Sequence, residues 1–176
     1  DEFLYARRGF SNMKEALSYA PFPFSYMYIP WKMFGSSGYI KQPDSIRQSF
    51  VWRNENNPNH HTPGKSIFNL EDVKQVNVHN ADPMEGNYTL PPISSNYQEF
   101  PRLDLNTIIH ANEEHLSLAN IHCNHYSCQS FQFYHDVKMT RGDVAKSSWD
   151  SMRTVDSFHV VDYNTVKDTE LSNMVS

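Results

Sequence analysis

The chain has 176 residues, of which 39% are hydrophobic, 14% aromatic and 20% charged, so it has enough apolar surface to bury a core and is not intrinsically disordered. Its 20 acidic and 15 basic residues give a formal net charge of −5, and the basic residues are scattered singly, which argues against a nucleic-acid partner. No apolar run approaches the ~20 residues of a membrane span, and the length fits one domain.

Two elements are predicted near the start of the chain. Apolar residues recur at helical spacing over residues 13–20, after a candidate N-cap at Ser11, which predicts a short helix. The aromatic and apolar run FSYMYIPW, residues 24–31, predicts a buried strand. Because proline lacks the N–H that a sheet needs, Pro30 is expected to close that strand.

Loops and short elements follow. FGSSG, residues 34–38, predicts a loop in which glycine permits close backbone approach to a ligand. SIRQSFVWR, residues 45–53, predicts a strand or a short helix–strand junction, and the polar residues 54–65 predict an exposed loop. Residues 65–81 predict strand, turn and strand, and the proline-rich residues 82–101 are expected to be irregular.

The second half is predicted to contain one strand and one clear helix. Residues 118–122 predict a strand that delivers His125 at its carboxyl end. SFQFYHDVKM, residues 130–139, predicts a helix capped by Ser130. The polar residues 144–176 are expected to form a less ordered tail.

Histidine and cysteine gather in the second half, but their spacing does not fit a structural zinc site. A zinc site would use His122, Cys123, His125 and Cys128, and the first two are neighbours that point to opposite faces of a strand. DYNTVKD, residues 162–168, lacks the glycine and the bidentate glutamate of a calcium loop. From spacing alone, His125 is a candidate metal or phosphate contact.

Four sequence blocks stand in a specific order along the chain: DEF at residues 1–3, PWKMFGSSG at 30–38, GKSIFNLEDVKQVNVHN at 64–80 and NHYSCQSFQFYHDVKMTRGD at 124–143. Each block is modest alone. Together, and in this order, they resemble the glycosyltransferase family 2-like and family 92 proteins, which carry D-x-D-E-F, W-x-x-F-G-S-S-G, a V-x-V-H strand and an H-Y segment. The resemblance continues to about Leu171.

The resemblance implies an α/β chain with a partial GT-A fold, the fold of nucleotide-diphospho-sugar transferases, in which helices flank a mixed sheet. Residues 1–176 would be the C-terminal portion of a single catalytic domain, without its N-terminal nucleotide-binding half. The implied activity is metal-dependent transfer of a hexose from a nucleotide-diphosphate sugar donor to a glycan or other hydroxyl acceptor, with inversion. The chain alone is then expected to be an inactive fragment.

The same resemblance assigns roles to individual residues. Asp1 matches the metal-binding Asp of the D-x-D motif, and His125 first, then His79, would complete the shell of Mn²⁺ or Mg²⁺. An inverting transfer needs a carboxylate base, for which Asp44 and Glu2 are the candidates. The remaining assignments are Lys65 and Arg141 for the donor diphosphate, and Trp31, Gly35, Ser36 and Ser37 for the sugar or acceptor.

A second class of function stays open. The chain is alternatively a non-catalytic module that binds carbohydrate or that a metal ion stabilises at its histidine-rich strand.

Overall fold

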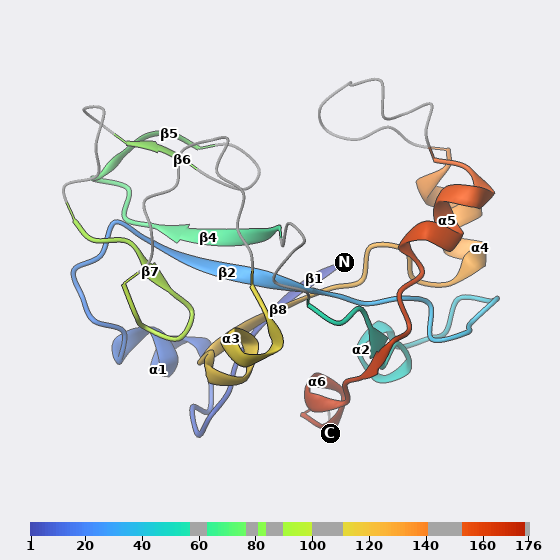
Figure 1. Cartoon of the computed structure of the whole chain (residues 1–176), viewed down its shortest axis with the longest axis horizontal. Helices are drawn as coiled ribbons and strands as arrows, with labels where there is room; N and C mark the ends of the chain where they lie inside the picture. The colour runs from blue at the N-terminus through green and yellow to red at the C-terminus, as the bar shows by residue number, and fades with distance from the viewer. Residues whose placement is uncertain (57–62, 77–80, 84–89, 100–110, 141–152, 175–176) are drawn as a thin grey trace. The chain divides into compact units, whose positions relative to one another are not determined.

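The computed structural model describes residues 1–56, 63–76, 81–83, 90–99, 111–140 and 153–174 (Figure 1). These residues form a mixed α/β structure with one mixed sheet and a few short helices. Its contacts divide the chain into two compact units. The first unit contains residues 1–2, 32–55 and 124–176, and the second contains residues 3–31 and 56–123. Among the described residues, no helix has both the length and the apolar composition to cross a bilayer.

The main sheet is built around β2, with β1 and β8 on one side and β4 on the other. β2 pairs antiparallel with β4, from Tyr26 opposite Phe68 to Pro30 opposite Gly64, and parallel with β7, so the sheet is mixed. The strands of this sheet are β1 (Glu2–Ala6), β2 (Tyr26–Met33), β4 (Gly64–Phe68), β7 (Ile93–Ser94) and β8 (Ile121–His125).

β2 confirms the predicted buried strand but extends past Pro30, so the prediction that this proline closes the strand is wrong. Residues 26–29 are almost fully buried, which explains their continuous apolar character. Proline is tolerated because it lies opposite the first residue of β4, where the next N–H, that of Trp31, donates to the Pro63 carbonyl at 2.9 Å.

The second unit contains two short helices, α1 and α3, that bear on the predicted helix over residues 13–20 and the predicted strand over residues 118–122. α1 (Met13–Ser18) confirms the first predicted helix, although the N-cap is Asn12, whose side chain accepts from the Glu15 amide at 2.9 Å. The predicted strand over residues 118–122 begins too early, because Leu118 is the last residue of α3 (Glu113–Leu118).

Two further strands of the second unit lie close together in sequence. β5 (Val73–Val76) follows β4 after a turn, which confirms the predicted strand, turn and strand over its described part. It pairs antiparallel with β6 (Ala81–Pro83) in a separate two-stranded sheet. The described hydrogen-bonding partner of β5 is therefore β6, in a sheet separate from the main one.

The first unit consists of short elements that lie far apart in the sequence. A helix–strand junction over residues 45–53 is confirmed, because α2 (Ile46–Ser49) precedes β3 (Trp52–Arg53). β3 pairs antiparallel with β9 (Val166–Lys167). The other elements are α4 (Phe131–Phe133), the π-helix η1 (Tyr134–Lys138), α5 (Val155–Val161) and α6 (Glu170–Asn173).

Residues 153–174, within the segment expected to be a less ordered tail, contain α5, β9 and α6. Phe158 of α5 is buried with Cys128 and Tyr134, and its ring lies 5.2 Å from that of Phe131 and 5.3 Å from that of Tyr134. This small core joins α5 to the helix over residues 131–138. Residues 144–152 and 175–176 lie outside the described part of the chain.

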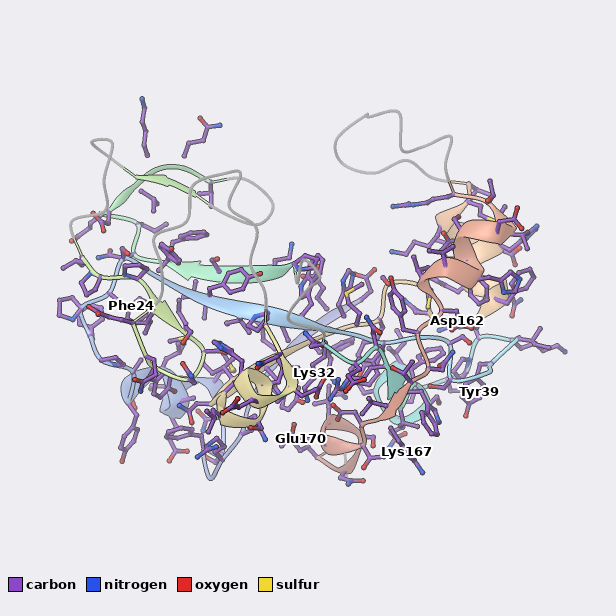
Figure 2. The ribbon with its side chains drawn as sticks, viewed as in Figure 1. Phe24, Lys32, Tyr39, Asp162, Lys167 and Glu170 are labelled. Carbon is purple, nitrogen blue, oxygen red and sulfur yellow. The ribbon has the colours of Figure 1, made fainter. Side chains whose placement is uncertain are left out.

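A buried ion-pair cluster lies in the first unit (Figure 2 labels Lys32 and Glu170). The Lys32 side chain is 3% exposed, and its ammonium lies 2.8 Å from Asp168 Oδ2 and 3.2 Å from Glu170 Oε2. Arg53 Nε donates to the same Asp168 oxygen at 2.8 Å. Burial lowers the pKa of Lys32, while the neighbouring carboxylates oppose that change. These charges connect the end of β2 with β3 and the start of α6.

Candidate metal centre

The first residue of the chain lies beside the end of β8 because β1 and β8 are neighbouring strands. The Tyr126 amide donates to the Asp1 carbonyl at 2.8 Å, and at the other end the Arg7 amide donates to the Asn120 carbonyl at 3.0 Å. This pairing makes the two strands antiparallel. The backbone of Asp1 is therefore fixed next to the residue that follows His125.

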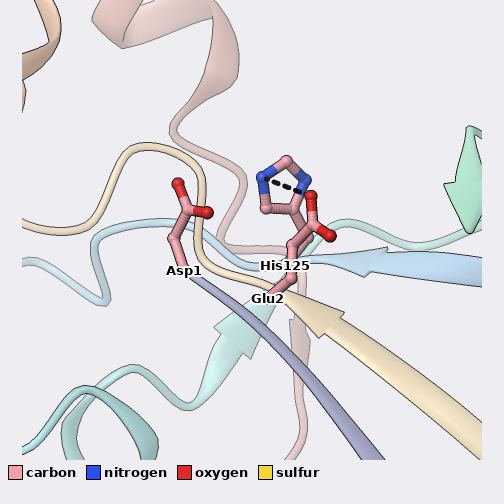
Figure 3. A group of neighbouring side chains, drawn as sticks. All are labelled: Asp1, Glu2 and His125. Atoms are coloured by element: carbon pink, nitrogen blue, oxygen red, sulfur yellow. Dashed lines mark ion pairs between the residues drawn. The ribbon is translucent and has the colours of Figure 1, made fainter. Parts of the chain in front are cut away.

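Three side chains with metal-binding atoms meet at this point: Asp1, Glu2 and His125 (Figure 3). One ligand atom from each lies within 4.8 Å of the others, and His125 Nε2 is 3.9 Å from Glu2 Oε1. The His125 side chain is 12% exposed, whereas those of Glu2 and Asp1 are 29% and 27% exposed. Strand pairing thus brings together a carboxylate pair and an imidazole that are more than a hundred positions apart in the sequence.

The three groups offer one ligand atom each to a single divalent cation, after side-chain rotations that bring those atoms closer together. Ligand atoms ~2.1 Å from an octahedral ion lie roughly 3 Å apart when adjacent and roughly 4 Å apart when opposite. The observed limit of 4.8 Å is only slightly wider. Carboxylates suit both ions, and an imidazole suits a transition metal such as Mn²⁺ better than Mg²⁺, which prefers oxygen. Asp1, Glu2 and His125 are the residues that would hold the ion.

Lys138, at the end of η1, lies next to the three ligands. Its ammonium lies 2.7 Å from Asp1 Oδ2, and its side chain is 12% exposed. A lysine at hydrogen-bond distance from a carboxylate carries a positive charge into the cluster. Sequence reasoning missed this residue, because nothing in the pattern of the capped helix singles out Lys138 from the other polar positions.

The FGSSG segment forms the predicted loop, but its polar groups bond within the first unit. The Ser36 amide and hydroxyl both donate to the Asp162 carboxylate, at 2.5 and 3.0 Å. The Ser37 amide donates to Asn164 Oδ1 at 2.9 Å, while its hydroxyl oxygen accepts from the amides of Val51 and Trp52. A sugar that bound these groups would have to compete with the bonds that hold the loop together.

Gly35 makes the close backbone approach expected of its loop, with the chain itself as the partner. Its amide donates to the Trp52 carbonyl at 3.0 Å. A Cβ at this position would overlap the Tyr163 carbonyl oxygen and lie 2.8 Å from Asn164 Oδ1. The absence of a side chain is therefore required by packing between the loop and residues 163–164.

The remaining predicted site residues are distributed over both units. Asp44 is exposed and precedes Ser45, the N-cap of α2. Trp31 and Lys65 lie in the second unit, where the Lys65 ammonium is 5.5 Å from the centroid of the Trp31 ring. His79 and Arg141 lie outside the described residues. The structure therefore brings Asp1, Glu2 and His125 together and places Trp31 beside Lys65.

The other residues of the rejected zinc pattern have separate environments. His122 is buried, with Nδ1 3.2 Å from the Tyr5 hydroxyl and Nε2 2.8 Å from the Leu116 carbonyl oxygen. Cys123 and Cys128 are buried, and neither is part of a disulfide. Burial raises the pKa of Cys128 to about 12. This thiol is therefore protonated at neutral pH, unlike a thiolate that coordinates a metal.

Comparisons of this chain with protein-family models, with curated proteins and with solved structures find no match. The relation to glycosyltransferases therefore stays a prediction that rests on the four sequence blocks.

Proposed function

We propose that this chain is part of a metal-dependent glycosyltransferase that moves a hexose from a nucleotide-diphosphate sugar to a glycan or other hydroxyl acceptor, with inversion. One observation carries the proposal: the Asp1 carboxylate and the His125 imidazole, far apart in the sequence, lie in one cluster with Glu2. The same two residues match the D-x-D-E-F and H-Y blocks of the family that the sequence resembles.

The chemistry of the reaction explains why such a cluster is needed. Departure of a nucleoside diphosphate builds negative charge on phosphate oxygens, and a bound Mn²⁺ or Mg²⁺ stabilises that charge. Asp1, Glu2 and His125 would hold the ion at the strand ends. Because Glu2 then serves as a ligand, Asp44 is the better candidate for the carboxylate that accepts the proton of the acceptor hydroxyl.

A non-catalytic, metal-stabilised module is the second candidate, and the FGSSG loop favours it. The groups of Ser36 and Ser37 that would contact a sugar already bond to Asp162, Asn164 and the backbone of residues 51–52. In that case the cation would only tie the first residues of β1 to the end of β8. The two candidates share the metal site and differ in whether a nucleotide sugar is turned over.

The metal site is tested first, by titrating the chain with Mn²⁺ and following bound Mn²⁺ by electron paramagnetic resonance. Asp1→Ala and His125→Ala are each expected to weaken binding by at least ten-fold, since each removes one of three protein ligands. His159→Ala serves as the matched control because His159 is an exposed residue of α5, outside the cluster. Equal Mn²⁺ affinity in all four proteins would remove the basis of the proposal.

Activity is tested with a longer protein that contains this chain, by assaying Mn²⁺-dependent hydrolysis of nucleotide sugars. The transferase predicts hydrolysis that Asp1→Ala and His125→Ala abolish. If Mn²⁺ binds at the cluster but no nucleotide sugar is hydrolysed or transferred, the metal-stabilised module is the correct function.

A further inference from the structure

We propose that Lys138 is an internal counterion of the Asp1–Glu2–His125 cluster. A divalent cation displaces the Lys138 ammonium from the cluster, and the ammonium then contacts a phosphate group bound to that cation. This inference rests on the proposed function, because it assumes that the cluster holds a metal ion. It assigns to Lys138 the contact with the diphosphate of the donor.

The ammonium of Lys138 already lies where a cation is expected. It is 2.7 Å from Asp1 Oδ2, an oxygen of the carboxylate that would bind the metal. A metal ion bound to this carboxylate and the ammonium repel each other, because both are positive. Binding of the cation therefore favours movement of the lysine ammonium away from Asp1.

The base of Lys138 is held firmly while its end can move. The helix that carries it starts at a cap in which Ser130 Oγ accepts from the Phe133 amide at 3.1 Å. Its last turn is a π turn, closed by a 2.9 Å bond from the Met139 amide to the Tyr134 carbonyl. Such wide turns recur at functional sites in proteins. The fixed helix keeps Lys138 beside the cluster, and its four-carbon stem lets the ammonium move by several ångströms.

After displacement, Lys138 has a specific use at this site. The ammonium remains near a divalent ion whose open positions would be taken by phosphate oxygens, and lysine binds phosphate as a mobile point charge. The lysine should thus oppose binding of the free metal ion and favour binding of a metal–phosphate complex. A lysine that only anchors the start of β1 would have neither effect.

The experiment compares the affinities of the chain for free Mn²⁺ and for the Mn²⁺–pyrophosphate complex. Lys138→Met is expected to bind free Mn²⁺ about ten-fold more tightly, the factor that Coulomb's law gives for a unit and a double charge roughly 6 Å apart in water. The same variant should bind the complex about five-fold more weakly or worse, while Lys138→Arg retains its binding. Lys167→Met, an exposed lysine of β9, is the matched control and should change neither affinity.

A second measurement uses the unmodified protein and does not depend on how the variants fold. Acetylation of lysines, read by mass spectrometry, should increase at Lys138 when Mn²⁺ is added and decrease again when pyrophosphate follows. If Asp1→Ala abolishes Mn²⁺ binding but neither the labelling of Lys138 nor the affinities of Lys138→Met change, the metal site stands and the role of Lys138 is refuted. If Mn²⁺ binds nowhere near Asp1, both the proposed function and this inference fail.

Discussion

Replacement of Asp168 with asparagine is expected to destabilise the first unit strongly, because one carboxylate oxygen neutralises two buried cations. Asp168 Oδ2 lies 2.8 Å from both Lys32 Nζ and Arg53 Nε, and the Asp168 side chain is only 8% exposed. Removal of one partner from a buried ion pair costs about 3–5 kcal/mol. Glu170, 3.2 Å from the Lys32 ammonium, still compensates part of the charge, so we expect a loss of about 3 kcal/mol.

This loss can be measured by urea denaturation and by thermal unfolding. For a chain of this size, about 3 kcal/mol corresponds to a fall in Tm of roughly 6–12 °C. Lys32→Met is the matched control, since it leaves Asp168 bonded to Arg53 and removes one buried charge. It is expected to cost about 1 kcal/mol. Equal destabilisation by the two variants, or a loss of less than about 1 kcal/mol in Asp168→Asn, would refute the shared role of Asp168.

The pH dependence of this difference gives an independent check. Burial favours the neutral acid, but the Lys32 ammonium and the Arg53 guanidinium outweigh burial and lower the pKa of Asp168 below its ordinary value of 3.8. A depressed pKa in the folded state contributes stability above the unfolded value, which is lost as pH falls through the folded value. The advantage of the wild type over Asp168→Asn should therefore be complete above about pH 4 and shrink below it.

Three further predictions concern packing and buried polar groups. Gly35→Ala should lower the free energy of unfolding, measured by urea titration, by about 3 kcal/mol or more, because the new Cβ meets the Tyr163 backbone. Gly38→Ala should lower it by only about 1–2 kcal/mol, because its Cβ would enter open space but its φ of +79° strains an alanine. Cys128, buried and with its pKa raised to about 12, should resist iodoacetamide at pH 8 until the chain is unfolded; rapid alkylation of the native protein, read by mass spectrometry, contradicts its burial. Asp162→Ala should lower the free energy of unfolding by about 1–3 kcal/mol, because it leaves the amide and hydroxyl of the buried Ser36 without the carboxylate that accepts from them. An unchanged Tm in thermal unfolding would argue against a stabilising role for the Ser36–Asp162 hydrogen bonds.

Local patterns in the sequence predicted the elements whose signals are themselves local. The apolar run in β2, the helical spacing in α1 and the cap at Ser130 each identify an element within about ten residues. The end of β2 was mispredicted because the tolerance of Pro30 depends on its partner Gly64 in another strand. Pairing with a neighbouring strand thus decided where β2 ends, which the local sequence alone did not.

The candidate metal centre was only partly accessible from the sequence. The resemblance to a glycosyltransferase family pointed to Asp1 and His125, and strand pairing brings these side chains together. Lys138 was not predicted, because its contact with Asp1 joins two residues that are 137 positions apart in the sequence. A contact between such distant residues leaves no repeat or characteristic spacing in the sequence.

The acidic segment at residues 162–168 shows the same limit. Its spacing excluded a calcium loop, yet gave no indication of what its polar residues bind instead. Asp162 accepts from Ser36, and Asp168 accepts from Lys32 and Arg53, over sequence separations of more than a hundred residues. No local pattern encodes such partners.

The dependence of Lys32 on Asp168 also affects how the protein is made. The two residues are 136 positions apart, and a ribosome adds roughly 5–20 residues per second, so Asp168 is synthesised about 7–27 s after Lys32. During that interval, burial of the end of β2 would leave the Lys32 ammonium without the carboxylate of Asp168. The first unit is therefore expected to fold late in translation, and nascent chains that stop before residue 168 should be substrates for chaperones or proteases.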